Sequence, residues 1–139
     1  AVNSDSFWLN GPTNTLERMA DIWDEKSMDG LLLLHSTADS LGYTERGDFN
    51  ITSDSRLIRR PAREISPYLF TGIQILHTRL FEMHLSDVFS LNMIYDRAIK
   101  EKRLFGIVHD GEWFHIGTPK GLSETERYMK QRYAEAQNQ

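Results

Sequence analysis

Two polar side chains lie next to segments that read as regular structure, and both are of types that bind ligands. Asp5 follows the short apolar run of Ala1 and Val2 after two polar residues, and the carboxyl end of a parallel strand is where α/β proteins bind their ligands. His115 comes just before Thr118-Pro119, a helix cap and first helical residue, which places free backbone N–H groups beside the imidazole. Asp5 also fits a turn or a helix cap, so the residue types alone leave its role open.

The stretch that ends at His115 is expected to form a β-hairpin followed directly by a helix. Asp110-Gly111 is typical of a two-residue type I′ turn, whose central residues both need positive φ. With that turn, Val108 faces Trp113 and Gly106 faces His115. A glycine opposite the imidazole leaves room for the ring or for a ligand. The residues alone favour an ordinary hairpin packed on a terminal helix.

Strand and helix patterns alternate along the chain and predict an α/β fold. The run Leu31–Leu34 is apolar throughout, as expected of a strand covered by helices on both faces of a parallel or mixed sheet. Helical periodicity follows a turn at Gly11–Asn14 and continues through about Asp24, and it also marks Asp87–Lys100. A further strand is expected over Pro67–Leu76, interrupted at Thr71-Gly72. A glycine inside a strand often marks the close approach of a ligand or another backbone.

The composition excludes several classes of protein. The 139 residues carry a net charge of −4, which offers no basic face for nucleic acid. No apolar run approaches the roughly 20 residues of a membrane span, so neither nucleic acid nor membrane is expected as a partner. The cysteine count is zero, which removes disulfides and cysteine metal sites and, with no signal peptide, favours a cytoplasmic protein of one domain.

Four segments, in order, resemble motifs of the sugar-1-phosphate nucleotidylyltransferases. Trp113–Pro119 resembles the family's Trp-x-Asp-[Val/Ile]-Gly-Thr-Pro motif, and Asn3–Asp5 resembles its Asn-Gly-Asp or Asn-Ala-Asp motif. Gly47–Phe49 is similar to the Gly-[Asp/Tyr]-Phe strand, and Tyr68–Ile73 is similar to the Tyr-x-x-[Thr/Ala]-Gly-[Ile/Leu] strand. The likeness is greatest to short bacterial forms that act on N-acetylmuramic acid 1-phosphate or on mannose 1-phosphate.

The resemblance implies an α/β, three-layer, Rossmann-like nucleotidyltransferase fold with a mixed, mainly parallel sheet, of which this chain supplies the second half only. The family's glycine-rich triphosphate loop has no counterpart, since the sequence contains no Gly-x-Gly. Residues 1–139 are therefore interpreted as the C-terminal, sugar-binding half, with the N-terminal, nucleotide-binding half absent from this chain. A start at Ala1 rather than Met fits a fragment or a processed product.

The activity that the resemblance implies is nucleotidyl transfer from a nucleoside triphosphate to a sugar 1-phosphate, with release of pyrophosphate. N-acetylmuramate 1-phosphate and UTP form the favoured substrate pair, which implies a role in cell-wall synthesis, and mannose 1-phosphate with GTP is the alternative. This chain alone is expected to be inactive. A non-catalytic sugar-nucleotide-binding or regulatory relative, and an unrelated α/β interaction domain, remain as hypotheses of other classes.

The resemblance also implies roles for particular residues. Asp5 is the implied catalytic residue and the ligand of the Mg²⁺ cofactor, an ion that prefers hard oxygen ligands. His115 occupies the position of a second metal-binding Asp, and imidazole suits softer ions. It is therefore interpreted as a donor to phosphate, as a ligand for a softer ion such as Mn²⁺, or as a lost metal site. The implied substrate-binding residues are Tyr43, Thr71, Gly72, Arg60 and Trp113.

Tyr43 and Arg60 each keep a plainer alternative. An aromatic face packs well against the C–H groups of a sugar, but Tyr43 also fits an ordinary half-exposed ring. The planar fork of an arginine suits phosphate. Arg60, however, lies in an Arg-Arg-Pro sequence where relatives carry Glu-Lys-Pro, and a solvated loop explains it equally.

If this chain supplies only half of the sheet, another polypeptide is expected to cover the exposed part. The strands at Ala1–Asn3 and Leu31–Leu34 are expected to leave apolar faces or edges uncovered. We therefore expect this chain to be accompanied by the N-terminal half of the same enzyme, or to form a homo-oligomer.

Overall fold

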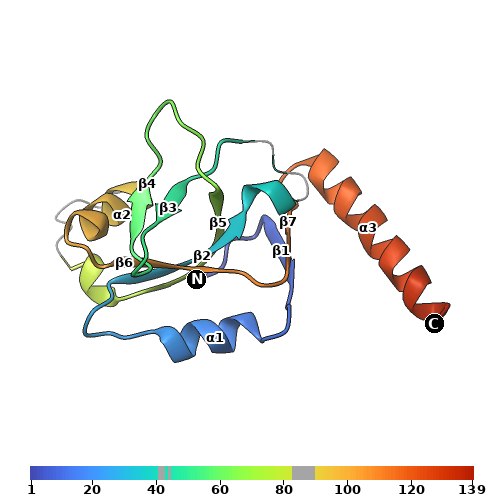
Figure 1. Cartoon of the computed structure of the whole chain (residues 1–139), viewed down its shortest axis with the longest axis horizontal. Helices are drawn as coiled ribbons and strands as arrows, with labels where there is room; N and C mark the ends of the chain where they lie inside the picture. The colour runs from blue at the N-terminus through green and yellow to red at the C-terminus, as the bar shows by residue number, and fades with distance from the viewer. Residues whose placement is uncertain (41–42, 44, 83–89) are drawn as a thin grey trace.

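The computed structural model describes residues 1–40, 43, 45–82 and 90–139, and a five-stranded sheet lies at its centre (Figure 1). In the order in which they lie side by side, its strands are β4 (Leu57–Arg59), β3 (Phe49–Ile51), β5 (Tyr68–Leu76), β2 (Gly30–Ser36) and β6 (Leu104–Val108). A smaller sheet pairs β1 (Ser6–Leu9) with β7 (Glu112–His115). The α-helices of the described residues are α1 (Thr15–Ile22), α2 (Leu91–Lys100) and α3 (Pro119–Gln137).

The leucine run of β2 holds the layers together, because alternate side chains of a strand point to opposite faces of the sheet. Leu31 and Leu33 pack with Met19 of α1, whereas Leu32 and Leu34 pack in the cluster that contains the buried side chains of α2. The two helices therefore cover the sheet from opposite sides (Figure 1). This confirms the predicted three-layer α/β arrangement and the prediction that this strand is apolar on both faces.

The sheet is mixed, as predicted, but the balance of strand directions is not the one expected. β2 pairs in parallel with β6, whereas the pairs β2–β5, β3–β5 and β3–β4 are antiparallel. Within the described five-stranded sheet one pairing of four is parallel, so parallel pairs do not predominate among the strands that this chain supplies. Short connections favour antiparallel pairs, and β3 and β4 are joined by residues 52–56 alone.

The predicted hairpin between residues 105 and 115 is wrong. Gly106 and Val108 of β6 pair with Leu32 and Leu34 of β2. In β7, Trp113 and His115 pair with the other sheet, opposite Trp8 and Ser6 respectively. Gly106 therefore does not face His115, and Val108 does not face Trp113.

The turn at Asp110-Gly111 explains why the hairpin does not form. In the described part of the chain, positive φ occurs at Gly47, Ser55, Gly72 and Lys102 and at no other residue, so neither turn residue has the conformation of a type I′ turn. The open edge of the buried leucine strand competes for β6, and the pairing there buries Leu104 and Phe105. Tertiary pairing thus outweighs the local turn preference.

The first residues run along β5 before the chain turns into β1. The amino group of Ala1 donates to the carbonyl of Gln74 at 2.8 Å, and Val2 forms a bridge with Ile73. The strand expected at Ala1–Asn3 is therefore present only as this isolated bridge, and Val2 is exposed. The first regular strand, β1, was not predicted.

The helices begin and end close to the expected residues. The helix predicted to follow the turn at Gly11–Asn14 and to end near Asp24 is α1. The helix expected from residue 87 is described from Leu91, and residues 87–89 lie outside the described part of the chain. Thr118 caps α3 as predicted, and its hydroxyl accepts a hydrogen bond from the Gly121 N–H at 3.0 Å. Among the described residues, no helix is both long and apolar enough to cross a lipid bilayer.

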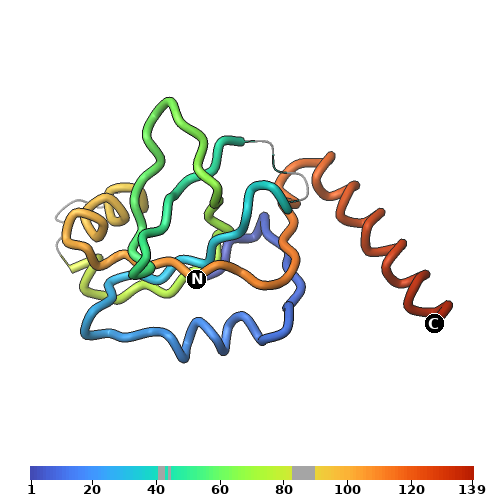
Figure 2. The backbone as a smooth tube through the Cα atoms, viewed as in Figure 1, coloured from blue at the N-terminus to red at the C-terminus, as the bar shows by residue number. Residues whose placement is uncertain are grey.

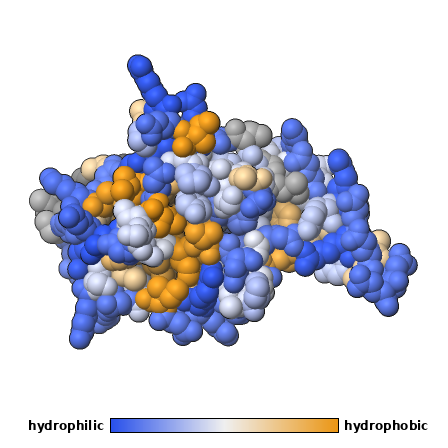
Figure 3. Space-filling model, viewed as in Figure 1, coloured by the Kyte–Doolittle hydropathy of each residue, from blue (hydrophilic) through white to orange (hydrophobic). Residues whose placement is uncertain are grey.

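An apolar groove remains open on the surface between α1 and β6. It has a volume of about 430 Å³, and Ile22, Leu31, Phe105 and Ile107 contribute to its walls. Apolar side chains gather on this side of the molecule in the space-filling view (Figure 3). The expectation that Leu31–Leu34 would have uncovered apolar faces is wrong, because these residues are 0–1% exposed between the two helices. The open apolar surface is this groove beside them.

Candidate active site

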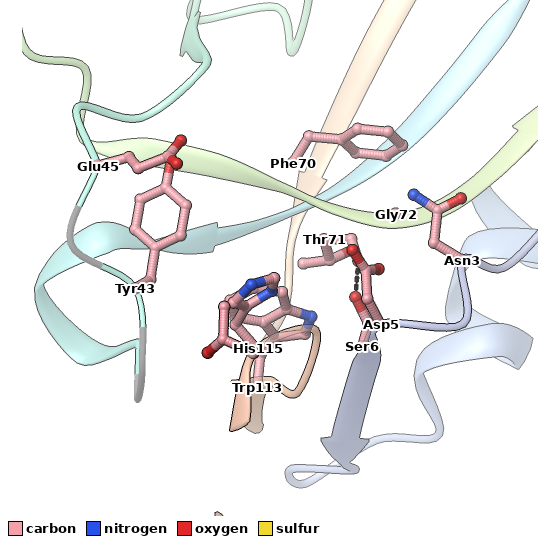
Figure 4. A pocket seen from close by; sticks show the side chains of 11 residues that line it. Asn3, Asp5, Ser6, Tyr43, Glu45, Phe70, Thr71, Gly72, Trp113 and His115 are labelled. Atoms are coloured by element: carbon pink, nitrogen blue, oxygen red, sulfur yellow. Dashed lines mark hydrogen bonds between the residues drawn. The ribbon is translucent and has the colours of Figure 1, made fainter. Parts of the chain in front are cut away.

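A cavity of about 260 Å³ lies where the small sheet meets β5 of the large one (Figure 4). The small sheet and the residues around it supply one wall, and β5 with the loop before β3 supplies the other. The described residues that line it are Asn3, Asp5, Ser6, Tyr43, Glu45, Phe70, Thr71, Gly72, Trp113, His115 and Thr118. The structure thus brings together every predicted site residue except Arg60.

Asp5 and His115 are neighbours because of the register between β1 and β7. Ser6 pairs with His115, and the Ile116 N–H donates to the carbonyl of Asp5 at 2.9 Å. A Cβ placed on Gly117 would lie 2.9 Å from Cε1 of His115 and 3.0 Å from Cβ of Asp5. The predicted catalytic pair therefore packs around one glycine, where a larger residue would force the pair apart.

Gly72 allows the N-terminal segment to lie against β5. Its φ is +86°, and an added Cβ would lie 2.7 Å from the side chain of Asn3. The Asn3 N–H donates to the Gly72 carbonyl at 2.9 Å. The glycine expected to mark a close approach therefore marks the approach of the chain's own residue 3, which also lines the cavity.

Thr71 supports the cavity wall with both its hydroxyl and its carbonyl. The hydroxyl donates to the Leu33 carbonyl at 2.8 Å, at a shift in the register between β2 and β5. The carbonyl accepts a hydrogen bond from the Ser6 hydroxyl (Figure 4). Thr71 is buried, so it joins the two sheets at the cavity.

Aromatic rings form the floor of the cavity around Trp113. The His115 ring stacks on it with a centroid distance of 6.2 Å, and the Tyr43 ring meets it edge-on at 6.4 Å. The Trp113 side chain is 4% exposed, and its indole N–H has no hydrogen-bond partner among the described residues. Burial, with the nearby carboxylate of Asp48, raises the pKa of Tyr43 to about 12. Its hydroxyl therefore keeps its proton and remains a donor.

Two further histidines fix the small sheet to the ends of β2 and β6. Nε2 of His109 lies 3.0 Å from the Leu9 carbonyl and 3.1 Å from the Glu112 carbonyl. Nε2 of His35 lies 3.1 Å from the Gly111 carbonyl. The position of His115 and Trp113 therefore depends on these contacts.

Arg60 does not reach the cavity. Its Nε donates to the Gly47 carbonyl at 3.0 Å, and its Nη1 lies within hydrogen-bond distance of the carbonyls of Pro61, Ala62 and Glu64. The guanidinium binds its own loop, because four backbone carbonyls lie within hydrogen-bond distance of Nε and Nη1. The expected placement of Arg60 beside a substrate is not what the structure shows.

Several residues that line the cavity were not predicted as site residues from the sequence, namely Ser6, Glu45, Phe70 and Thr118. A strand over residues 6–9, had it been recognised, would have placed Ser6 opposite His115. Glu45 precedes the Gly47–Phe49 segment and carries no pattern of its own.

The charged side chains that line the cavity are acidic. Asp5 and Glu45 contribute carboxylates, His115 contributes an imidazole, and the described lining contains no lysine or arginine. Within the described part of the chain, no group of three His, Asp or Glu side chains is arranged to hold a metal ion. The cavity suits an uncharged polyol more than a bare phosphate.

Sequence comparison finds a relative that spans most of this chain. An N-acetylmuramate alpha-1-phosphate uridylyltransferase from Caulobacter vibrioides is 31% identical over 119 residues, which are 86% of this chain and 49% of the relative. The chain therefore spans about half the length of this relative. No family model matches the sequence.

Two solved structures share the fold. A Bacillus anthracis protein assigned as a glucose-1-phosphate thymidylyltransferase, in complex with sucrose, superposes with a TM-score of 0.65 at 19% identity, covering 88% of this chain and 50% of that one. HddC from Yersinia pseudotuberculosis, complexed with GMP-PN, superposes with a TM-score of 0.60 at 17% identity, covering 91% and 53% of the two chains. The order of the motifs, the fold and the sequence relative agree, and this chain belongs to the sugar-1-phosphate nucleotidylyltransferase family, as a segment that spans about half the length of its relatives.

Proposed function

We propose that this chain is the acceptor-sugar half of an enzyme that transfers a nucleotidyl group from a nucleoside triphosphate to a sugar 1-phosphate. The observation that carries the proposal is one cavity built from distant segments: Asp5, Thr71 and His115 all line it. In the reaction, an oxygen of the sugar phosphate attacks the α-phosphorus of the triphosphate, the bond to the leaving phosphate breaks, and pyrophosphate departs. No covalent protein intermediate is needed.

The cavity residues would bind and orient the sugar. Tyr43 offers aromatic surface to sugar C–H groups, and Trp113, which lines the cavity but is 4% exposed, supports the Tyr43 ring through an edge-on contact. The protonated Tyr43 hydroxyl would donate to a sugar hydroxyl or carbonyl. Holding the sugar phosphate in line with the α-phosphorus is the main contribution that such residues make to phosphoryl transfer.

Asp5 would hold Mg²⁺, which neutralises phosphate charge in reactions of this kind. A protein usually binds this ion through one or two carboxylates, with substrate phosphates completing the shell. Asp5 is an exposed carboxylate at the cavity, so it fits such a role. Because the described lining of the cavity contains no lysine or arginine, we assign the cationic groups for the triphosphate to another part of the enzyme.

The N-terminal, nucleotide-binding half of the enzyme would supply those cationic groups. The open groove between α1 and β6, with its apolar walls, would be covered when that half is present, because burial of apolar surface stabilises such contacts. We place the reaction in the cytoplasm, in keeping with a sequence that contains no cysteine. N-acetylmuramate 1-phosphate and UTP are the proposed substrates, on the strength of the Caulobacter relative.

Thermal unfolding of this chain with UDP-N-acetylmuramic acid, GDP-mannose and MgCl₂ tests the proposal. A ligand at about ten times its Kd stabilises the native state by about 1.4 kcal/mol and raises the Tm by about 5 °C. The larger shift is expected for the UDP-sugar, and an equal or larger shift for GDP-mannose would favour mannose 1-phosphate as substrate. No shift with any sugar nucleotide, in wild type or in Asp5→Asn, would contradict the proposal.

A non-catalytic relative remains the second candidate, because His115 stands at the position of a metal-binding Asp. Pyrophosphate release, measured with the N-terminal half supplied, separates the two. Turnover that depends on Mg²⁺ and is lost in Asp5→Asn supports an enzyme. Binding of the UDP-sugar without turnover supports a binding or regulatory protein.

A further inference from the structure

An apolar groove separates α3 from the small sheet, away from the candidate active site. Its volume is about 510 Å³. Phe7 and Ile116 line one side, and Leu122, Met129 and Tyr133 of α3 line the other. Leu122 and Tyr133 are 45% and 65% exposed, so the described part of the chain leaves this apolar stripe open to solvent.

The second half of α3 has little support from the rest of the molecule. Figures 1 and 2 show the helix projecting away from the two sheets toward the C-terminus. Gly121 and Thr125 are its buried residues, and residues 130–139 are all exposed. An isolated helical end of this kind is marginal in water, and packing against another surface would stabilise it.

The exposed stripe has the spacing of a helix–helix seam. Leu122, Met129 and Tyr133 are separated by seven and four residues, and positions with these spacings lie on one face of a helix. Glu126 and Lys130 flank the stripe at the groove. Neither forms a salt bridge within the described part of the chain.

These charges are self-complementary for one arrangement of two helices. If two copies of α3 pack antiparallel about a two-fold axis at residue 128, Glu126 of each copy lies opposite Lys130 of the other, and Leu122 and Tyr133 lie within one residue of facing each other. A parallel arrangement would instead place each charge beside its own kind, which is unfavourable. A two-fold contact uses the same patch on both subunits, and this patch satisfies that condition.

We propose that α3 is the interface of a homodimer, in which the groove of each copy is covered by α3 of a second copy packed antiparallel along Leu122, Met129 and Tyr133. The seam from Leu122 to Tyr133 spans about 16 Å at about 1.5 Å per residue. Because the contact between the two helices is this short, we expect the dimer to dissociate reversibly. The proposal is independent of the reaction, because none of these side chains lines the candidate active site.

Sedimentation velocity of charge-reversal variants tests the seam. Glu126→Lys and Lys130→Glu each place like charges opposite each other, so each is expected to weaken self-association at least tenfold. The double variant restores the opposite pairing and is expected to associate within threefold of wild type. Glu135→Lys and Arg127→Glu change the charge by the same amounts at other exposed positions of α3 and are expected to leave association unchanged. A helical circular-dichroism spectrum checks that every variant is folded.

Cysteine cross-linking gives a second measurement, which a chain without cysteine makes simple. Oxidation of Leu122→Cys/Tyr133→Cys is expected to give a covalent dimer. Lys120→Cys/Gln131→Cys, with the same spacing at exposed positions, is expected to stay monomeric. A wild-type monomer at millimolar concentration, a double charge reversal that does not restore association, or a failure to cross-link would each overturn the proposal. Loss of the wild-type dimer when the N-terminal half is added would assign the groove to that half and overturn it as well.

Discussion

The Thr15 hydroxyl and Nδ1 of His109 lie 3.0 Å apart, although 94 positions separate the two residues in the chain. The other ring nitrogen of His109 faces two carbonyl acceptors, those of Leu9 and Glu112. Nε2 must therefore carry the proton, and Nδ1 accepts from Thr15. This neutral imidazole ties α1 to the end of β1 and the start of β7, the strands that place Ser6 and His115 at the cavity.

Stability is expected to fall as pH falls through the titration range of His109. Burial lowers the pKa of His109 below its ordinary value of 6.5, so in acid the unfolded state takes up a proton before the folded state does. The stabilisation is complete above about pH 6.5 and declines below it. Thermal unfolding between pH 5 and 8 measures it. In His109→Gln, which keeps an N–H donor without titrating, this decline is expected to shrink, and an unchanged pH profile would show that other groups cause it.

Replacement of Asp29 is expected to lower the free energy of unfolding more than replacement of an exposed carboxylate. Although burial favours its neutral form, hydrogen bonds from Arg103 and Arg79 outweigh that effect and hold the pKa of Asp29 below its usual value. Asp29→Asn would leave both guanidinium groups facing a neutral amide. The expected loss in free energy of unfolding is about 3 kcal/mol, measured by urea denaturation at pH 7.

An exposed ion pair provides the control for that experiment. Asp54 pairs with Arg56 at the turn between β3 and β4, and both side chains are well exposed. Asp54→Asn removes the same charge at a solvent-exposed site, so it is expected to lower the free energy of unfolding much less than Asp29→Asn does. A similar cost for Asp29→Asn would mean that its two arginine contacts do not persist in solution.

Gly72→Ala is expected to lower the free energy of unfolding by about 2–3 kcal/mol. The positive φ of Gly72 disfavours any L side chain, and the new methyl group would lie 2.7 Å from the Asn3 side chain. Urea denaturation measures the loss. In an Asn3→Gly background the steric part is removed, so a smaller cost for Gly72→Ala is expected there. An equal cost in both backgrounds would assign the whole effect to backbone strain.

The sequence predicted the elements whose local pattern and tertiary environment agree. The leucine run from Leu31 to Leu34 specifies a strand that is buried on both faces, and Thr118-Pro119 specifies a helix start; both form as expected. The candidate residues Asp5 and His115 also converge on one cavity. Each of these features follows from residue type and short-range spacing, or from a motif in which the spacing reflects the fold.

The sequence failed where long-range pairing decides the outcome. Asp110-Gly111 favours a hairpin locally, but the edge of β2 binds β6, and β1 binds β7. For the hairpin, the competing partner lies far outside the window in which the pattern was read. Arg60 has the chemistry of a phosphate ligand, yet its Nε and Nη1 bind four backbone carbonyls of its own and a neighbouring loop. Backbone carbonyls are present at every residue, so the residue types do not reveal this competition.

His115→Asp is expected to weaken binding of the sugar phosphate at least tenfold, measured by isothermal titration calorimetry with N-acetylmuramate 1-phosphate. The cavity already contains the carboxylates of Asp5 and Glu45, and a third would repel the phosphate, which the imidazole is proposed to bind as a donor. His115→Asn keeps an uncharged donor and is expected to lose less affinity. Added Mg²⁺ would reduce the loss in His115→Asp by screening the new charge. If His115→Asp instead binds more tightly and turns over faster with Mg²⁺, the position is a lost metal ligand, and the role of His115 as a phosphate donor is wrong.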